Sequence, residues 1–472
     1  MSTIRRVAKN TSVVLVWNTV SRFIGLLIAI YLARYLGVVG YGNYSFIIAY
    51  ALFFGVFIDL GINSVIVREI CKNRERTREL IANGVGIKLA LFVLVFLIAF
   101  SVISFASYSS EVKTGVLIAL LGLVFTSMFS LLSTIFQADL KMEYPAFADL
   151  ASKLVLGGAI LLISYQKGGL FSIVLATLLA GILSFILLYV LLLGRIRAVA
   201  EFNTRIWREM LGPAVLLGLS GIFASVMIRV DTILISLIRG NIEVGYYAPP
   251  SQLTDAVTFI PLAFMTSLLP LMSTYSKTSK QALDKSFRLA AKYMFALSIP
   301  MAFGTTLLSG RIITAVYGAE FLPSAPVLVV MVWCDILYFY IIILEGLLTS
   351  IDKQKNIFIA TVIAALSNVV LNLLLIPPLG FIGASIALLL SYLILTITHI
   401  HLMPRLLRAI DTNFIIRSTI ASLVMALFIE YSTLHLYALI LLSALLYFIL
   451  LAVLGGVSNE DIEILKKLRM KA

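Results

Sequence analysis

Charged residues are scarce in this sequence. Of its 472 residues, 12% are charged and 61% are hydrophobic, whereas a soluble globular domain has about 25% charged residues. So few charges cannot cover the surface of a water-soluble particle of this size. The composition therefore excludes a soluble enzyme and a disordered or fibrous chain, and it predicts an all-α polytopic membrane protein.

Residues that carry common site chemistry are also scarce. The two cysteines, Cys71 and Cys334, lie in a charged loop and in an apolar span, so no disulfide framework is indicated. The three histidines, His399, His401 and His435, lack the spacing of a zinc site. The sequence has no P-loop and no Ser/His/Asp arrangement with a face toward solvent. We therefore expect no metal, no cofactor and no enzymatic activity.

Long apolar runs dominate what is present. Each run is long enough to cross a bilayer as a helix, which takes about 20 residues, and Gly, Pro or charged residues separate the runs. No loop is long enough to fold as a separate domain, so we expect the function to lie within the membrane. The sequence predicts fourteen transmembrane helices, at 12–33, 44–67, 81–107, 114–136, 146–165, 170–193, 210–237, 247–272, 289–308, 326–349, 357–376, 380–402, 414–432 and 436–455.

The positive charges follow a topology rule. The net charge is +13. With the N-terminus placed in the cytoplasm, the cytoplasmic segments hold 25 Lys and Arg residues and the external loops hold five. Because positive residues favour the cytoplasmic side, both termini are predicted to be cytoplasmic in a multi-pass protein of the cell membrane. This explains the basic character without a nucleic-acid partner.

Two segments rich in glycine and tyrosine indicate an internal repeat. Residues 35–44 follow the first predicted helix and residues 238–247 follow the seventh. Spans 1–6 and 7–12 are therefore predicted to be parallel repeats, a plan in which substrate binds at the repeat interface. We expect an N-lobe at 1–194, a C-lobe at 195–403, and two further helices with a cytoplasmic tail at 404–472.

Two arginines lie deep inside the predicted spans. An ionisable group at the bilayer centre costs about 2.5–3.5 kcal/mol on insertion scales, so Arg22 in span 1 and Arg229 in span 7 need a reason to be there. Guanidinium groups suit phosphate oxygens, which predicts a site for an anionic headgroup. The alternative is ion pairing, of Arg22 with Asp59 and of Arg229 with Asp231 or Asp255.

Three lysines also lie within spans. Lys153 is in the middle of span 5, and Asp149 precedes it by one helical turn in the favourable order, so a local salt bridge is expected beside a phosphate-binding role. Lys88 and Lys292 lie within two turns of cytoplasmic helix ends. We expect these two side chains to extend toward the membrane surface.

Carboxylates and amides occur in the later spans. Asp335 and Glu345 both lie in span 10, and membrane carboxylates serve in proton relays and sodium sites or as structural hydrogen-bond partners. Either residue is a candidate for a coupling ion. Asn368 and Asn372 share one face of span 11, where we expect them to bond neighbouring helices.

Several stretches resemble the polysaccharide-unit flippases of the multidrug/oligosaccharidyl-lipid/polysaccharide superfamily. The similarity spans most of the chain and keeps the family's order, and the motifs together are more specific than any one alone. The stretches are Ser21–Gly25, Leu32–Gly37, Gly40–Tyr44, Asp59–Glu69, Asp231–Ile235, Val244–Ala248, Tyr317–Ser324 and Gly380–Ser385.

The resemblance implies two six-helix lobes in a V shape plus two C-terminal helices. It implies a flippase that works by alternating access. The implied substrate is an oligosaccharide linked to polyprenyl or dolichyl (pyro)phosphate, which moves from the cytoplasmic to the external leaflet. The implied purpose is the assembly of a surface polysaccharide or of a glycoprotein glycan. Arg22 matches the first-helix arginine of related peptidoglycan-precursor flippases. The implied partners are this substrate and membrane lipid. H⁺ or Na⁺ is a candidate coupling ion, and the chain is expected to be a monomer open to association with polysaccharide-assembly proteins.

Four alternatives belong to other classes. A cation or drug antiporter of the superfamily would normally have twelve helices and a cavity dominated by carboxylates. A peptidoglycan-precursor lipid flippase would share the phosphate chemistry. A membrane glycosyltransferase would need large external loops or an acidic motif facing solvent, which the sequence lacks. A scaffold would have little reason to keep six basic residues inside its spans.

Overall fold

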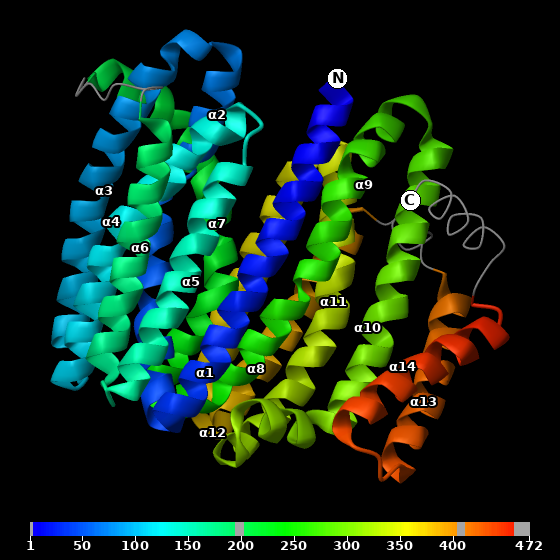
Figure 1. Cartoon of the computed structure of the whole chain (residues 1–472). Coiled ribbons are helices and arrows are strands. Elements are labelled where there is room, and N and C mark those ends of the chain that lie inside the picture. Colours follow the sequence, from blue (N-terminus) through cyan, green and yellow to red (C-terminus); the bar gives the residue numbers. More distant parts are fainter. Residues whose placement is uncertain (1–2, 194–202, 404–410, 457–472) are drawn as a thin grey trace. The chain divides into compact units, whose positions relative to one another are not determined.

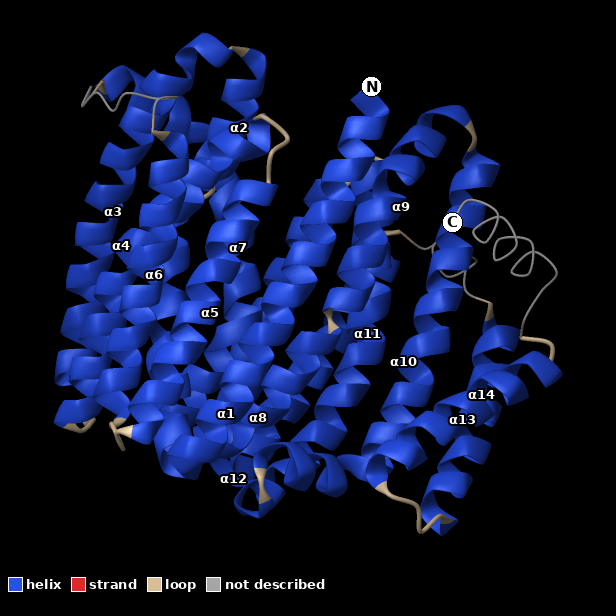
Figure 2. Cartoon of the chain, in the orientation of Figure 1, coloured by secondary structure: helices blue, strands red, loops and turns tan. Residues whose placement is uncertain are grey.

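The computed structural model describes residues 3–193, 203–403 and 411–456. Every regular element in these ranges is a helix (Figure 2). The predicted lobe boundaries at 194 and 403 fall at the two gaps between these ranges. The tail from residue 457 lies outside the described residues. So do the arginines at 195, 197, 405 and 408, which were predicted to be cytoplasmic. The all-α prediction is confirmed.

Residue contacts divide the chain into two compact units. The first unit comprises residues 1–252 and 365–384, and the second comprises 253–364 and 385–472. Helix α7 (Thr204–Arg239) packs against α1 (Thr3–Asp59) and therefore belongs to the first unit. This division by contacts differs from the predicted lobes, whose boundaries stay a prediction.

The helices can be followed along the chain in Figure 1. Those of the first unit, after α1, are α2 (Ile62–Lys72), η1 (Arg74–Arg76), α3 (Thr77–Phe105), α4 (Ser110–Ala138), α5 (Glu143–Tyr165), α6 (Leu170–Leu192), α7 and most of α8 (Asn241–Val257). Those of the second unit are α9 (Phe259–Thr278), α10 (Lys280–Tyr317), η2 (Ala319–Ser324), α11 (Ala325–Ser350), α13 (Thr412–Tyr431) and α14 (Leu436–Val453). Helix α12 (Gln354–Leu402) contributes residues to both units.

Short polar side chains begin several helices. The side chains of Ser109, Asn203, Ser279 and Asp411 each accept a hydrogen bond from a backbone N–H in the first turn that follows. These bonds satisfy amide groups that have no partner within the helix. Beyond the caps, the helix satisfies its own backbone polar groups, which is what a segment in hydrocarbon requires.

The described residues contain twelve helical stretches long and apolar enough to cross a membrane, where fourteen spans were expected. Two of the twelve, Thr19–Lys72 with 54 residues and Gln354–Leu402 with 49 residues, are far longer than the about 20 residues that one crossing needs. Each is interrupted by a glycine with non-helical backbone, Gly37 at φ 65° and Gly380 at φ 58°. The predicted breaks are therefore kinks, and each long stretch covers two of the expected spans.

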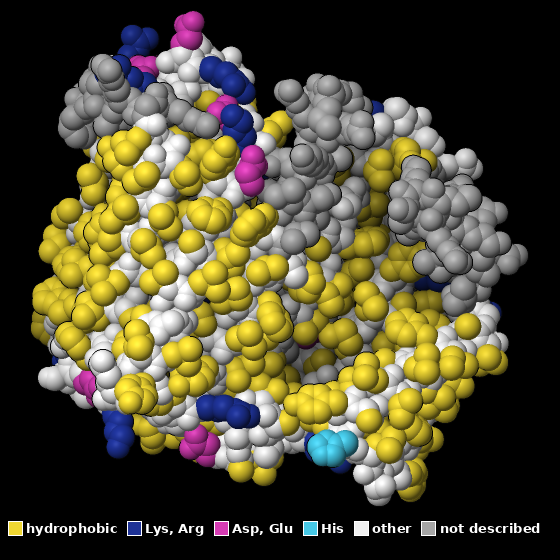
Figure 3. All heavy atoms as spheres, in the orientation of Figure 1, with side chains coloured by type: hydrophobic (Ala, Val, Ile, Leu, Met, Phe, Trp, Pro, Cys, Tyr) yellow, Lys and Arg dark blue, Asp and Glu magenta, His cyan; other side chains and the backbone are white. Residues whose placement is uncertain are grey.

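Each unit has its own apolar core. In the first unit, side chains of α2, α3 and α4 pack with those of α6 and α7, including Ile66, Leu131 and Leu188. In the second unit, α9, α10 and α11 form one cluster, and α10, α13 and α14 form another. The face shown in Figure 3 is mainly hydrophobic and carries few charged side chains, as expected of a protein that spans a membrane.

Candidate functional site

A polar cluster joins α1 to α5 in the first unit. Lys153 Nζ lies 2.9 Å from Asp149 Oδ2 and 2.6 Å from Ser21 Oγ, and the Ser21 hydroxyl also donates to Asp149. The predicted salt bridge between Asp149 and Lys153 is confirmed. The two side chains remain 40% and 32% exposed, so the lysine is neutralised but still reachable by an arriving anion.

Asp59 pairs with Lys88. Lys88 Nζ lies 2.8 Å from Asp59 Oδ1, and its side chain is fully buried while that of Asp59 is 40% exposed. A second bond runs from Nζ to the carbonyl oxygen of Ser127 at 3.4 Å. The alternative pairing of Asp59 with Arg22 is therefore not formed. The expectation that Lys88 extends to the membrane surface was wrong, because a carboxylate inside the helix bundle pairs with it.

Arg22 and Arg229 have no carboxylate partner among the described residues of the first unit. Arg22 is exposed on α1 and Arg229 is half-buried on α7, and neither takes part in an ion pair between described residues. The predicted pair of Arg229 with Asp231 is not formed. Both guanidinium groups therefore keep their donors for another anion.

Asp231 is held by neutral donors. It is 2% exposed, and its two oxygens accept hydrogen bonds from the hydroxyl of Tyr247 at 2.8 Å and from Asn372 Nδ2 at 2.7 Å. The Asn372 amide also donates to the carbonyl oxygen of Asn368 at 2.9 Å. The prediction that these amides bond neighbouring helices is confirmed for Asn372, which joins α12 to α7.

The two repeated segments, residues 35–44 in α1 and residues 238–247 at the junction of α7 and α8, contact each other, which the sequence did not predict. A Cβ atom on Gly42 would lie 1.9 Å from the carbonyl oxygen of Asn241, and one on Gly245 would lie 2.1 Å from that of Val38. The side chains of Asn43 and Asn241 also hydrogen bond at 2.8 Å. The signal was present in the sequence, because both glycines lie at the same position of the repeat.

A second polar group lies in the second unit. Asp335 on α11 is 6% exposed, and it interacts electrostatically with Asp255 on α8 and with Tyr392 on α12. Glu345, ten residues further along α11, is half-buried outside this group. The sequence singled out Asp335 but offered Asp255 only as one of two alternative partners of Arg229, since helix spacing does not show which helices face each other.

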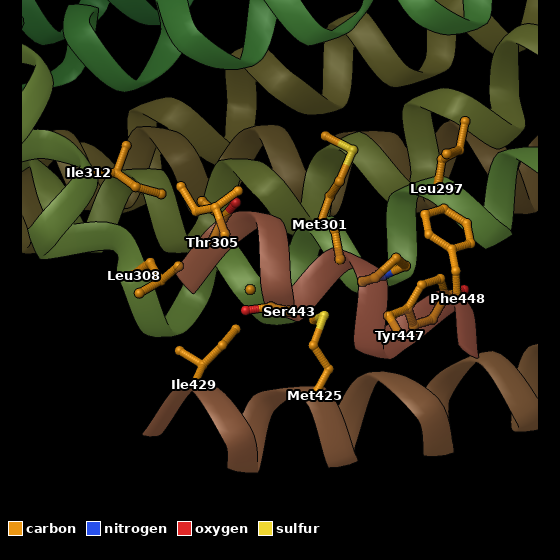
Figure 4. A pocket seen from close by; sticks show the side chains of 14 residues that line it. Leu297, Met301, Thr305, Leu308, Ile312, Met425, Ile429, Ser443, Tyr447 and Phe448 are labelled. Carbon is orange, nitrogen blue, oxygen red and sulfur yellow. The ribbon is translucent and has the colours of Figure 1, made fainter. Parts of the chain in front are cut away.

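An apolar pocket of about 230 Å³ lies between α10, α13 and α14 of the second unit. Figure 4 shows side chains of all three helices directed into it, among them Met301 and Leu308, Met425 and Ile429, and Tyr447. Its volume is below the about 300–1,000 Å³ of typical small-molecule sites. The pocket suits a few methyl or methylene groups and is too small and apolar for an oligosaccharide.

The described residues contain no group of three or more His, Cys, Asp or Glu side chains placed to hold a metal ion. They form a multi-pass helical membrane protein with cationic side chains inside its helices. Residues 7–276 match the family described as polysaccharide biosynthesis protein, and residues 208–455 match the family described as lipid II flippase MurJ. The first match covers more than half of the chain, which therefore belongs to the polysaccharide biosynthesis protein family, a family of membrane transporters and not of enzymes.

Individual relatives agree with this membership. The chain is 28% identical over 189 residues to the low-salt glycan biosynthesis flippase Agl15 of Haloferax volcanii, a match that spans 40% of this chain and 39% of that protein. It is 24% identical over 324 residues to a protein of Shigella flexneri described as an O-antigen transporter, spanning 65% of this chain and 76% of the relative. The chain thus matches about two fifths of the first relative's length.

The fold is that of a solved flippase. The structure of lipid II flippase MurJ in an inward closed conformation superposes with a TM-score of 0.80, covering 93% of this chain and 97% of that chain at 18% identity. At this identity the likeness shows a common fold. The expected fold class is therefore confirmed in its coarser form, an all-α polytopic membrane protein with the fold of that flippase.

Proposed function

We propose that this protein is a flippase for an oligosaccharide linked to a polyprenyl or dolichyl (pyro)phosphate. It would move this substrate from the cytoplasmic to the external leaflet by alternating access, for assembly of a surface polysaccharide or a glycoprotein glycan. The observation that carries the proposal is the pair of guanidinium groups, Arg22 and Arg229, that lie inside membrane helices with no carboxylate partner among the described residues.

Phosphate chemistry explains why arginines stay in the membrane. Sugars and phosphate cannot cross about 30 Å of hydrocarbon unaided. Guanidinium forks bind phosphate oxygens with two parallel hydrogen bonds, so Arg22 and Arg229 would neutralise the headgroup. Lys153 is the third candidate, because its partner Asp149 and the lysine itself are both partly exposed and a phosphate can compete for the ammonium group.

The topology proposed is fourteen crossings with both termini in the cytoplasm. The kinks at Gly37 and Gly380 divide the two longest helical stretches, which gives two crossings each. The distribution of basic residues supports this orientation, with 25 on the predicted cytoplasmic side against five outside. A V-shaped pair of lobes at 1–194 and 195–403, followed by 404–472, remains part of the proposal.

The isoprenoid tail of the substrate does not need a polar path across the membrane. The isoprenoid tail is soluble in lipid and would stay there while the sugars cross. Asp335 or Glu345 would bind a coupling ion, H⁺ or Na⁺, if transport is driven by a gradient. The protein would work as a monomer and could associate with other polysaccharide-assembly proteins.

A proteoliposome assay tests the proposed function. A lipid-linked oligosaccharide is placed in one leaflet, and its arrival in the other is followed with a lectin or glycosidase added outside. We expect movement with the native protein, loss of movement with Arg22→Ala, and retention with Arg205→Ala, an arginine that is 88% exposed at the start of α7. Unchanged flipping by Arg22→Ala would refute the phosphate site.

One alternative keeps specific support. The match of residues 208–455 to the lipid II flippase family makes a peptidoglycan-precursor lipid the second candidate substrate. The same assay with that lipid in place of the oligosaccharide lipid separates the two. No movement of either lipid, together with gradient-driven efflux of organic cations, would instead assign the protein to the antiporters.

A further inference from the structure

A cluster of polar side chains in the first unit lies apart from the residues proposed to bind phosphate. We call it the Asp59 group, and it comprises Asp59 at the end of α1, Asn63 in the first turn of α2, Lys88 on α3, and Ser127 and Ser130 on α4. Lys88 Nζ bonds to Asp59 Oδ1 at 2.8 Å and to the carbonyl oxygen of Ser127 at 3.4 Å. Asn63 Nδ2 donates to Ser130 Oγ at 2.6 Å. These contacts, about one turn of α4 apart, join four helices.

The predicted second span is broken inside this group. Leu60 and Gly61, the two residues between α1 and α2, have positive φ angles of 42° and 79°. Among the described residues other than glycine, Leu60 is the one with positive φ that lies within a predicted span, here 44–67. This conformation is unfavourable for leucine and is typical of functional sites. Broken membrane helices also form the substrate sites of many transporters, so the break indicates a binding site.

Several oxygens of the group lack a hydrogen-bond partner among the described residues. Asn63 Oδ1 and Ser127 Oγ are buried atoms with none. Lys88 bonds to Asp59 through Oδ1, which leaves Asp59 Oδ2 without a described partner on a side chain that is 40% exposed. Buried polar atoms are normally satisfied, so these positions need a hydrogen-bonding ligand or water. A ligand would first reach Asp59 and Ser130, which are the more exposed members.

The chemistry of the group suits a neutral ligand rich in hydroxyls. Lys88 neutralises Asp59, so the group offers no net charge to a phosphate or to a metal cation. Asp59 Oδ2 and Asn63 Oδ1 are acceptors, and the hydroxyls of Ser127 and Ser130 can both donate and accept. A sugar hydroxyl also donates and accepts, and neighbouring hydroxyls on one sugar ring can bond to two such groups at once.

We propose that the Asp59 group binds hydroxyls of a sugar in the headgroup of the transported lipid. This inference rests on the proposed function and deepens it, because it gives the sugar its own binding residues. The arginine and lysine side chains proposed above would bind the phosphate. Asp59, Asn63, Ser127 and Ser130 would bind the sugar, and affinity for the substrate therefore depends on the sugar as well as on the phosphate.

Binding measurements on the purified full-length chain in detergent test this site without any transport. The probes are undecaprenyl diphosphate and the same lipid carrying glucose, galactose or N-acetylglucosamine. Dissociation constants are obtained from the rise in melting temperature with lipid concentration, since a ligand of the folded state stabilises it. We expect at least one glycosylated lipid to bind about tenfold tighter than the bare lipid, the effect of roughly two hydrogen bonds. If none binds tighter, the proposal is overturned.

Matched variants locate the sugar site. Asn63→Ala and Ser130→Ala should each reduce this preference by about threefold, because they weaken binding of the glycosylated lipid more than that of the bare lipid. Ser133→Ala is the control, since this hydroxyl of α4 bonds to the carbonyl oxygen of Phe129 in its own helix. The two test substitutions lie on different helices, so either one carries the test if the other variant does not fold.

A purely structural role for Asn63 and Ser130 would weaken binding of both kinds of lipid equally. A group that binds only water would leave the preference unchanged in both variants. Either result overturns the proposal.

The two proposals can fail separately. Binding that depends on the sugar and on Asn63, in a protein that moves no lipid, would keep this site and reject the proposed function. Flipping by a protein whose preference for the sugar is the same with and without Asn63→Ala would keep the flippase and reject the sugar site.

Discussion

Gly42 and Gly245 lie so close that a Cβ atom on Gly42 would come within 2.8 Å of the backbone nitrogen of Gly245. Each glycine also faces a carbonyl oxygen of the opposite helix, Asn241 of α8 for Gly42 and Val38 of α1 for Gly245. The contact is reciprocal, because each helix supplies one glycine and one carbonyl. The bond between Asn43 and Asn241 adds a side-chain contact at the same place. Backbone thus packs on backbone, and no side chain can move aside to make room.

Alanine at either glycine should destabilise the protein. A methyl group in a closely packed site costs about 1–3 kcal/mol, so we expect Gly42→Ala and Gly245→Ala each to lower the melting temperature of the purified protein. Gly158→Ala on α5 is the matched control, because a Cβ there would meet nothing within 4 Å. Equal melting temperatures for Gly42→Ala and Gly158→Ala would show that α1 and α8 are not closely packed at this contact.

Breaking the Lys88–Asp59 pair from the carboxylate side should cost stability. Asp59→Asn leaves a fully buried ammonium group with one carbonyl at 3.4 Å. We expect a loss of about 2 kcal/mol in the free energy of unfolding, less than the roughly 3–5 kcal/mol for a fully buried pair, because Asp59 is 40% exposed and partly screened.

The double variant Asp59→Asn/Lys88→Met should recover most of that loss, since no buried charge remains. Arg205→Ala, at an exposed pair with Glu209, should change stability by under about 0.5 kcal/mol. Denaturant unfolding followed by fluorescence provides the free energies. A double variant no more stable than Asp59→Asn alone would argue against the pairing.

The native cysteines report the orientation. Cys71 is exposed on α2 and Cys334 is buried on α11, and residues 68–80 are predicted to be cytoplasmic. A membrane-impermeant maleimide should therefore leave Cys71 unlabelled in intact cells and label it after permeabilisation. Glu111→Cys in a Cys71→Ser background, in a loop predicted to be external, should be labelled in intact cells. Labelling of Cys71 in intact cells would reverse the topology.

Releasing Lys153 from Asp149 should strengthen binding of an anionic headgroup. Asp149 and the phosphate compete for the same ammonium group, so Asp149→Asn should lower the apparent KM for the lipid-linked substrate by about threefold, and Lys153→Met should raise it. The effect is small because partly exposed ion pairs are worth roughly 1 kcal/mol or less. Lys280→Met, at the exposed start of α10, is the control. If Asp149→Asn weakens binding, Asp149 positions Lys153 instead of competing for it.

The sequence predicted the class of protein and most of its helices because both depend on composition and on the length of apolar runs. The ends of the runs followed local signals, so α3 to α7 were found close to their observed bounds. At Gly37 and Gly380 the same signals marked a change of direction, and the helix continued on both sides of it.

The partners of buried charges could not be predicted in the same way. Hydropathy indicates how deep Lys88, Asp59 and Arg22 lie in the membrane. The ion-pair partner of each residue also depends on which helices are neighbours and on how each helix is rotated about its axis. Only the local pair, Asp149 with Lys153, follows from spacing along one helix. The contact of Lys88 with Asp59 joins α3 to α1, and the bond of Asn372 with Asp231 joins α12 to α7.

The contact between the two repeated segments has an evolutionary consequence. If the repeats descend from one duplicated unit, Gly42 and Gly245 are copies of the same ancestral position, as are Gly37 and Gly240, which both have positive φ. Copies that touch each other cannot diverge independently, since a larger residue in one is opposed by the backbone of the other. Other positions of each repeat can diverge in sequence, whereas glycine is expected to be kept at both copies of this position.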